Sequence, residues 1–252
     1  TVVTCALSAI VLGPQELTRI AGYGLAADLF VVNNLIAYKG GNYFAGPLRE
    51  LPFLHLWSLA VEEQFYVVWP VVLGPIARLA TRTFKLPFRR TIALGMSVAV
   101  LGSLAASVVL TRTAPRWAFY GLPTRVYEFA LGGAAVLFWT SKTWSTTTRN
   151  AICGAGVVAL AASMVVTPVG TGFPSGWPLL AAGGTVLVIL GTLAAPDTRL
   201  RGPGHWVGAV LATRPMSVVG RYSYGWYLWH WPAFVLGVAA WGTTWARVAC
   251  VL

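Results

Sequence analysis

The chain has 252 residues, of which 57% are hydrophobic and 10% charged, and its formal net charge is +11. With a mean hydropathy of +0.69, it lies far from soluble proteins, in which roughly a quarter of residues are charged. The basic residues fall between apolar segments, which favours cytoplasmic loops and lipid headgroups as their partners and excludes a nucleic-acid-binding class. This composition predicts an all-α, polytopic transmembrane helix bundle.

Motifs of several soluble enzyme classes are missing from the sequence. It contains no G-x-S-x-G elbow, Walker loop, dinucleotide fingerprint or H-E-x-x-H pair. Cys5, Cys153 and Cys250 lie in apolar segments without pair or ligand spacing, so we expect neither a disulfide framework nor a metal site. Chemistry by membrane-embedded groups, with no metal, is the expectation.

Apolar runs separated by glycine, proline and charge clusters predict seven to eight helices. Their expected ranges, in chain order, are 2–13 (partial), 20–37, 55–77, 91–111, 119–140, 150–167, 177–195 and 216–240. The connection 196–215 is expected to hold a short interfacial helix from His205 to Ala212. Because no linker or repeat divides the chain, a single membrane domain over 1–252 is the simplest organisation.

The distribution of lysine and arginine predicts the orientation of these helices. Alternate connections carry eleven basic residues on one side and four on the other, and the positive-inside rule makes the first group cytoplasmic. The 55–77 helix then starts at the outer face. Glu62 and Glu128 come to similar depths, roughly 10 to 14 Å along their helices, and His230 reaches the same outer half.

The segment LPFLHLWSLAVEEQFYVVWPVVL, residues 51–73, carries a polar stripe on a helix that is otherwise apolar. A helical wheel places within about 80° of arc His55, Ser58, Glu62, Tyr66 and Trp69. A carboxylate facing lipid costs several kcal/mol, so the stripe is expected to face other helices or a wet cavity. Glu63 lies about 100° from Glu62 and is expected to do a different job. Alternatively, His55 and Glu63 are interfacial anchors, and Glu62 pairs structurally with an arginine.

A second ionisable pair stands in the segment GLPTRVYEFALGG. Arg125 and Glu128 are three residues apart on one helical face, after a break at Pro123. One interpretation is a pair that neutralises itself. The other is that Arg125 holds an anionic group or sets the pKa of a carboxylate across the bundle, since its guanidinium stays charged.

Polar groups also interrupt two further apolar helices. In GRYSYGWYLWHWPAFVL, Ser223, Tyr227 and His230 share a face, either within an aromatic packing belt or within a site where the histidine ring nitrogens need a partner. In VVNNLIAYKGGNYF, Asn33 and Asn34 are expected to bond across helices.

These segments resemble a known family. LPFLHLWSLAVEEQFYVVWPVVL is similar to the signature of the acyltransferase family 3 integral-membrane O-acyltransferases, commonly His-Thr-Trp-Ser-Leu-Ser-Val-Glu-Glu-Gln-Phe-Tyr, with Leu56 in place of Thr and Ala60 in place of Ser. TRVYEFALGG resembles the family's Arg-x-x-Glu helix, and GRYSYGWYLWHWP resembles its late Tyr-Ser-x-x-Leu-Tyr-x-Trp-His-x-Pro helix. LFVVNN is a weaker match to its Phe-x-Ser-Asn helix. The resemblance spans about residues 20 to 240.

The resemblance implies a bundle of about ten helices in the bacterial plasma membrane. It implies transfer of an acyl group, usually acetyl from acetyl-CoA, to a hydroxyl of an exported carbohydrate or lipid-linked glycan of the cell envelope. The implied partners are therefore acyl-CoA, a glycan acceptor and the lipid bilayer. The family's catalytic histidine and its arginine partner belong to the first transmembrane helix, so the resemblance implies a fragment, truncated at both ends, that lacks the first helices.

Acyl transfer to a sugar hydroxyl needs a base, donors for the oxyanion and close approach of thioester and alcohol. We expect the residues that carry this chemistry to be Glu62, Glu63, Arg125, Glu128 and His55. Those expected to line the substrate path are Ser58, Tyr66, Tyr227 and His230. The alternatives are a transporter or flippase whose buried charges relay protons, and an inactive truncated family member.

Overall fold

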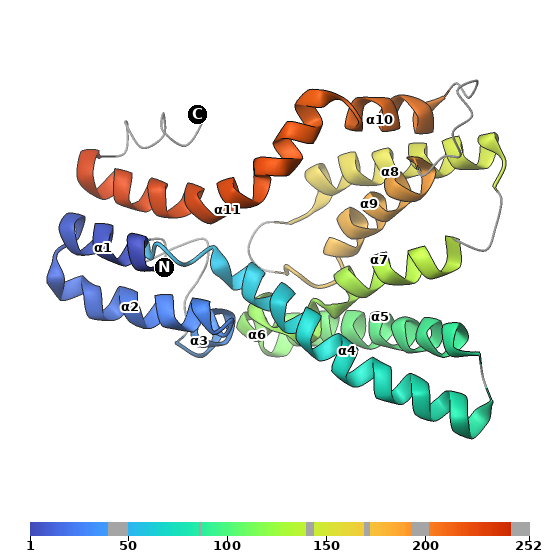
Figure 1. Ribbon diagram of the computed structural model, residues 1–252, viewed down its shortest axis with the longest axis horizontal. Coiled ribbons are helices and arrows are strands. Elements are labelled where there is room, and N and C mark those ends of the chain that lie inside the picture. Colours follow the sequence, from blue (N-terminus) through green and yellow to red (C-terminus); the bar gives the residue numbers. More distant parts are fainter. Residues whose placement is uncertain (40–49, 86, 140–143, 169–171, 193–201, 243–252) are drawn as a thin grey trace. The chain divides into compact units, whose positions relative to one another are not determined.

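The computed structural model describes residues 1–39, 50–85, 87–139, 144–168, 172–192 and 202–242. Within these ranges every regular element is a helix, as the composition predicts (Figure 1). The chain divides into two compact units, one made of Thr1–Gln64 and Val218–Leu252 and the other of Phe65–Ser217. The organisation as a single domain stays a prediction.

The first unit contains three short helices and parts of two long ones. They are α1 (Val2–Val11), α2 (Pro14–Asp28), α3 (Val32–Lys39), the start of α4 (Leu56–Phe84) and most of α11 (Arg214–Trp241). Helices α1 and α2 pack side by side (Figure 1). Gly13 makes the turn between them at φ 86°, where a side chain is strained, and Pro14 starts α2 with its fixed φ.

The expected helix 20–37 is wrong as one helix, because it breaks between α2 and α3. Phe30 takes φ 54° at the break, which frees backbone groups from the helical ladder. Gln64 of α4 compensates: its Nε2 donates to the Phe30 carbonyl at 2.6 Å and to Asn33 Oδ1 at 2.9 Å. Asn33 is fully buried, so its amide bonds across helices as expected. The residue that the sequence analysis missed here is Gln64.

Residues 51–55 form a buried, non-helical segment that leads into α4. Irregular backbone away from water requires hydrogen-bond partners for its carbonyls. Two side chains one turn apart on α11 supply them: Trp231 Nε1 donates to the Leu51 carbonyl at 3.0 Å, and the Tyr227 hydroxyl donates to the His55 carbonyl at 2.7 Å. Helix α4 therefore begins within the first unit, and its start at the outer face of the membrane stays a prediction.

The second unit contains the remaining helices. They are the end of α4, α5 (Phe88–Thr113), α6 (Pro115–Tyr120), the 3-10 helix η2 (Leu122–Thr124), α7 (Val126–Trp139), α8 (Thr146–Val166), α9 (Pro178–Thr192) and α10 (Pro203–Leu211). Helices α8 and α9 pack against one another, and α5 packs against α6 and α7 (Figure 1). A Cβ on Gly191 would lie 2.6 Å from the Cys153 Cβ, so the absence of a side chain lets α8 and α9 approach closely.

Two further expectations about this unit have opposite outcomes. The helix expected at 205–212 is confirmed as α10. The expected helix 119–140 is wrong, because α6, η2 and α7 replace it where Gly121 and Pro123 interrupt the ladder. Glu128 is consequently in the first turn of α7, and the depth counted for it from residue 119 does not hold.

Two described helices, α5 and α8, are long and apolar enough to cross a membrane. Helix α4 is longer, about 43 Å at 1.5 Å per residue, but Glu62, Glu63 and Gln64 lower its hydropathy. Spanning by the other helices stays a prediction. Several residues used in the charge count or cysteine analysis lie outside the described residues: Arg49, Lys142, Arg199, Arg201, Arg247 and Cys250.

Replacing Gln64 by leucine tests the join between α4 and the break after α2. We expect Gln64→Leu to destabilise the fold by about 1–2 kcal/mol, because it leaves the Phe30 carbonyl and the Asn33 amide without their partner at similar side-chain volume. Thermal unfolding in detergent should show a melting temperature lower by a few degrees. Gln15→Leu on the exposed side of α2 is the matched control, and equal melting temperatures for the two variants would contradict the assignment.

Candidate functional site

His55 is the centre of a polar cluster in the first unit. Its side chain is 4% exposed, and neither ring nitrogen has a hydrogen-bond partner. The backbone of Pro52 and of Leu228 lies close to the ring but outside hydrogen-bond geometry. Two aromatic rings of α11 meet the imidazole edge-on, Tyr227 at 5.3 Å and His230 at 5.2 Å between centroids. His55 is therefore buried among rings, which contradicts its reading as an interfacial anchor.

The Tyr227 hydroxyl joins the two helices of the cluster. It donates its single proton to the His55 carbonyl at 2.7 Å, and it lies 2.8 Å from Ser58 Oγ. The Ser58 hydroxyl has one proton of its own, which it can donate to the Tyr227 oxygen at 2.8 Å or to the His55 carbonyl at 3.3 Å. The Tyr227 hydroxyl thus fixes both the last residue before α4 and the first turn of α4.

The tautomer of His230 follows from its backbone contact. Nδ1 lies 2.7 Å from the Tyr227 carbonyl, which can only accept, so Nδ1 carries the proton. In the neutral ring the lone pair is then on Nε2. The cluster therefore presents a histidine whose basic nitrogen is set by the turn of α11 that also carries Tyr227.

Helix α4 continues the polar stripe beyond the cluster. Glu62 lies one turn after Ser58 on the same face, and Glu63 is turned by about 100° from it. Both carboxylate residues are partly buried. Farther along, Tyr66 is 54% exposed, whereas Trp69 stacks on Phe65 at 5.1 Å. The stripe is thus covered at its start and open at Tyr66.

Arg125 and Glu128 form a closed arrangement in the second unit. Arg125 Nη1 lies 2.8 Å from Glu128 Oε1, and Arg125 is 7% exposed. The guanidinium also donates to the Phe119 carbonyl from Nε and Nη2, and it lies 5.6 Å and 5.5 Å from the ring centroids of Phe119 and Phe173. These contacts favour the self-neutralising interpretation, and the first-turn position of Glu128 adds a favourable interaction with the amino end of α7.

The structure brings together four of the residues that the sequence singled out. These are His55, Ser58, Tyr227 and His230, all in the first unit. Glu62 and Glu63 follow them on α4, while Arg125 and Glu128 belong to the second unit. The roles given to all these residues stay predictions.

Sequence reasoning missed the groups that hold the cluster in place. Trp231 was expected only as part of an aromatic belt, but its indole N–H donates a hydrogen bond to the Leu51 carbonyl of the buried segment. The proline of the Leu-Pro-Phe sequence at Pro52 was the available signal, because a proline disfavours helix before it and removes a backbone donor. Among the described residues, no three histidine, cysteine, aspartate or glutamate side chains are grouped to hold a metal ion.

Comparison with known proteins agrees with the motifs. A family profile described as "Acyltransferase domain" matches residues 2–248. The peptidoglycan O-acetyltransferase OatA of Listeria monocytogenes is 27% identical over 93% of this chain and 37% of its own length. The putative membrane-bound transacylase BcsY of Komagataeibacter xylinus is 29% identical over 84% of this chain and 49% of its own. The putative peptidoglycan O-acetyltransferase YrhL of Bacillus subtilis is 29% identical over 90% of this chain and 36% of its own.

The match covers this chain almost entirely but the relatives only in part. The chain spans between about a third and a half of the length of these curated relatives. No solved structure matches it. Since the profile match extends from residue 2 to residue 248, the chain belongs to the acyltransferase family that its three motifs resemble.

Proposed function

We propose that this chain forms the membrane part of an O-acyltransferase that moves an acyl group, acetyl in the simplest case, from acyl-CoA to a hydroxyl of a cell-envelope polysaccharide. The family match over residues 2–248 carries the proposal. Two relatives are named for O-acetylation of peptidoglycan, which favours a glycan acceptor. The cluster of His55, which is buried, and Ser58, Tyr227 and His230, which are partly buried, supplies ionisable and hydroxyl groups in a site partly shielded from solvent.

The reaction sets the requirements that the residues must meet. The acceptor oxygen forms a bond to the acyl carbon, the carbon–sulfur bond of the thioester breaks, and the hydroxyl proton passes through a base to the departing thiolate. A base near neutral pKa and a donor for the oxyanion each lower the barrier. Exclusion of water also prevents hydrolysis of the thioester.

The resemblance places the principal catalytic histidine in a helix that these residues do not include. In the proposal, Glu62 or Glu63 orients that histidine, and Tyr227 and His230 line the path of the acyl group or the acceptor. Ser58 and Tyr227 are coupled at 2.8 Å, so this path begins at a fixed pair of hydroxyls. His55 stands beside them, and both of its ring nitrogens are buried without a hydrogen-bond partner.

In the proposal, Arg125 and Glu128 hold neighbouring parts of the chain in place and take no direct part in the reaction. The guanidinium holds the chain before α7 through the Phe119 carbonyl and its own carboxylate partner. A charged group that lies against two neighbouring aromatic rings cannot reorient without losing these contacts. The pair therefore contributes a rigid wall, and its charge is balanced before any substrate arrives.

Neutralising the carboxylates of α4 tests their part in the chemistry. We expect Glu62→Gln or Glu63→Gln, whichever orients the base, to lower kcat about 100-fold in the full-length protein, because glutamine keeps the shape but loses the charge that supports an imidazolium. The assay is acetyl transfer to a glycan acceptor in membranes. Glu16→Gln, in an exposed ion pair with Arg19, is the control. Near-normal turnover in both variants at matched expression removes the carboxylates from the mechanism.

Removing the Tyr227 hydroxyl tests the cluster. Tyr227→Phe removes the shorter of the two hydrogen bonds to the His55 carbonyl and leaves only the 3.3 Å bond from the Ser58 hydroxyl, so we expect a loss of about 1–2 kcal/mol in stability. Turnover should fall about tenfold or more, because a 1 Å displacement of reacting groups already costs up to 100-fold. Tyr224→Phe, on an exposed position of the same helix, is the comparison. Equal melting temperature and turnover in the two variants would refute the role of the hydroxyl.

Replacing Arg125 by lysine separates position from direct chemistry. Lysine cannot bond Glu128 and the Phe119 carbonyl through one planar fork, so we expect Arg125→Lys to lower the melting temperature by several degrees, with turnover falling in parallel. Arg19→Lys in the exposed pair should change neither. Loss of turnover at an unchanged melting temperature would instead assign Arg125 to direct contact with substrate.

A further inference from the structure

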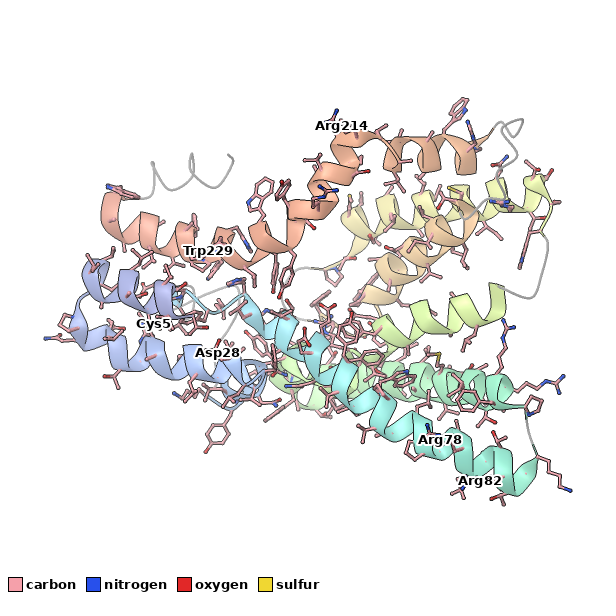
Figure 2. All side chains as sticks on the ribbon, viewed as in Figure 1. Cys5, Asp28, Arg78, Arg82, Arg214 and Trp229 are labelled. Carbon is pink, nitrogen blue, oxygen red and sulfur yellow. The ribbon has the colours of Figure 1, made fainter. Side chains whose placement is uncertain are left out.

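A cavity of about 290 Å³ lies within the first unit, beside the His55 cluster. Helices α1, α2, α4 and α11 and the segment before α4 contribute to its wall, which includes Asp28, His55, Leu56, Leu59, Trp229 and Pro232. Figure 2 labels two of these, Asp28 at the end of α2 and Trp229 on α11. Its volume is at the lower end of the roughly 300–1,000 Å³ of ligand pockets, which suits one ring and excludes a whole coenzyme.

The charge of the wall restricts the ligand further. Asp28 is the single carboxylate among the described residues that line the cavity, with no lysine or arginine beside it. Its Oδ1 accepts a hydrogen bond from the Thr1 hydroxyl, whereas its Oδ2 has no donor within the part of the chain that the structure describes. A carboxylate only accepts hydrogen bonds, so it favours a ligand rich in hydroxyl or amide donors. Phosphate groups require arginine, lysine or backbone donors, and they would be repelled here. A phosphorylated acyl donor therefore does not fit this cavity.

Trp229 adds an apolar surface to the cavity, in contrast to the acceptor oxygens of Asp28. Its side chain is 50% exposed although it lines the cavity, so the indole is accessible to a bound ring. The face of an indole carries negative potential and attracts weakly positive C–H groups. A ligand with C–H groups on its faces and hydroxyls on its edges matches Trp229 and Asp28 together, and this is the pattern of a pyranose.

His55 is a second feature of this cavity that indicates a ligand. It is part of the wall, and its two buried ring nitrogens have no hydrogen-bond partner. An unpaired buried polar group costs free energy, so such groups in proteins usually have a partner when the site is filled. A hydroxyl of a bound pyranose ring can hydrogen-bond to one of these nitrogens after a small rearrangement of the imidazole.

We propose that this cavity is the subsite for one pyranose ring of the acceptor glycan, with Trp229 as the stacking surface, Asp28 as hydrogen-bond acceptor and His55 facing a ring hydroxyl. The proposal rests on the proposed function for the identity of the ligand as an acceptor. It assigns sugar recognition to Asp28 and Trp229, which have no part in the catalytic assignments.

The test is direct binding of a β-1,4-linked N-acetylglucosamine tetramer to the full-length protein in detergent, by titration calorimetry without acyl donor. Trp229→Leu and Asp28→Asn should each weaken binding about tenfold or more. Trp226→Leu, one turn away at 54% exposure and not part of the cavity wall, should bind as the wild type does. Trp229→Phe, which keeps an aromatic face, should retain most of the affinity and so controls for folding. Equal affinity in all variants, or no binding by the wild type, overturns the subsite.

Transfer kinetics on the same variants separate this proposal from the proposed function. The expected result is a KM for the glycan raised about tenfold in Trp229→Leu and Asp28→Asn, with the KM for acyl-CoA unchanged. Transfer with a wild-type KM for the glycan in both variants overturns the subsite and leaves the function standing. Binding that depends on Trp229 in a full-length protein that transfers no acyl group supports the subsite and overturns the function.

Discussion

The pairing of backbone carbonyls in residues 51–55 is the interaction on which the rest of the site depends. This segment is buried without being helical, so its carbonyls need donors from elsewhere in the fold. Tyr227 and Trp231 meet this need because they are four residues apart on α11 and their targets, His55 and Leu51, are four residues apart as well. One contact pattern thus fixes the start of α4, the rotation of α11 and the position of His55.

The same constraint explains why the polar residues of this apolar chain occur in groups. Where the ladder breaks after α2, Gln64 and Asn33 form an amide pair that also binds the Phe30 carbonyl. Where it breaks before α7, the Thr124 hydroxyl shares its one proton between the Ala118 and Gly121 carbonyls, and Arg125 donates to a third. A side-chain donor is present at each of these breaks. The polar residues of the motifs are therefore partly structural, whatever else they do.

Much of the fold was predictable from composition and period, and much of the site was not. The helical class and the short helix at α10 follow from composition and apolar runs. The break at Phe30 was missed because an apolar run gives no sign of a left-handed residue. The break at Pro123 was expected, but the short 3-10 turn that forms there and the later start of α7 were not.

The burial of His55 was left open between two interpretations, for a different physical reason. A histidine at the edge of an apolar run is compatible both with a wet helix end and with a packed segment, since neighbours distant in sequence decide between them. Residues 227–231 are the neighbours that decide here, more than 170 positions away along the chain. No local pattern contains that information. The resemblance to the family indicates only that the two segments occur in the same chain.

The arrangement separates two kinds of charge, and this separation bears on acyl transfer. Arg125 has its carboxylate, a carbonyl and two aromatic rings, so its charge is compensated within its own unit. His55 has aromatic rings around it but no hydrogen-bond partner on either ring nitrogen. A hydrogen bond between a ligand hydroxyl and His55 therefore contributes more binding free energy than one to a group that already has a partner. Preorganised groups of the first kind hold a site in shape, while groups of the second kind gain their bonds only when substrate is present. A hydrogen bond that forms only with substrate can strengthen binding or lower the activation barrier. The cavity beside His55 is where such a bond is available.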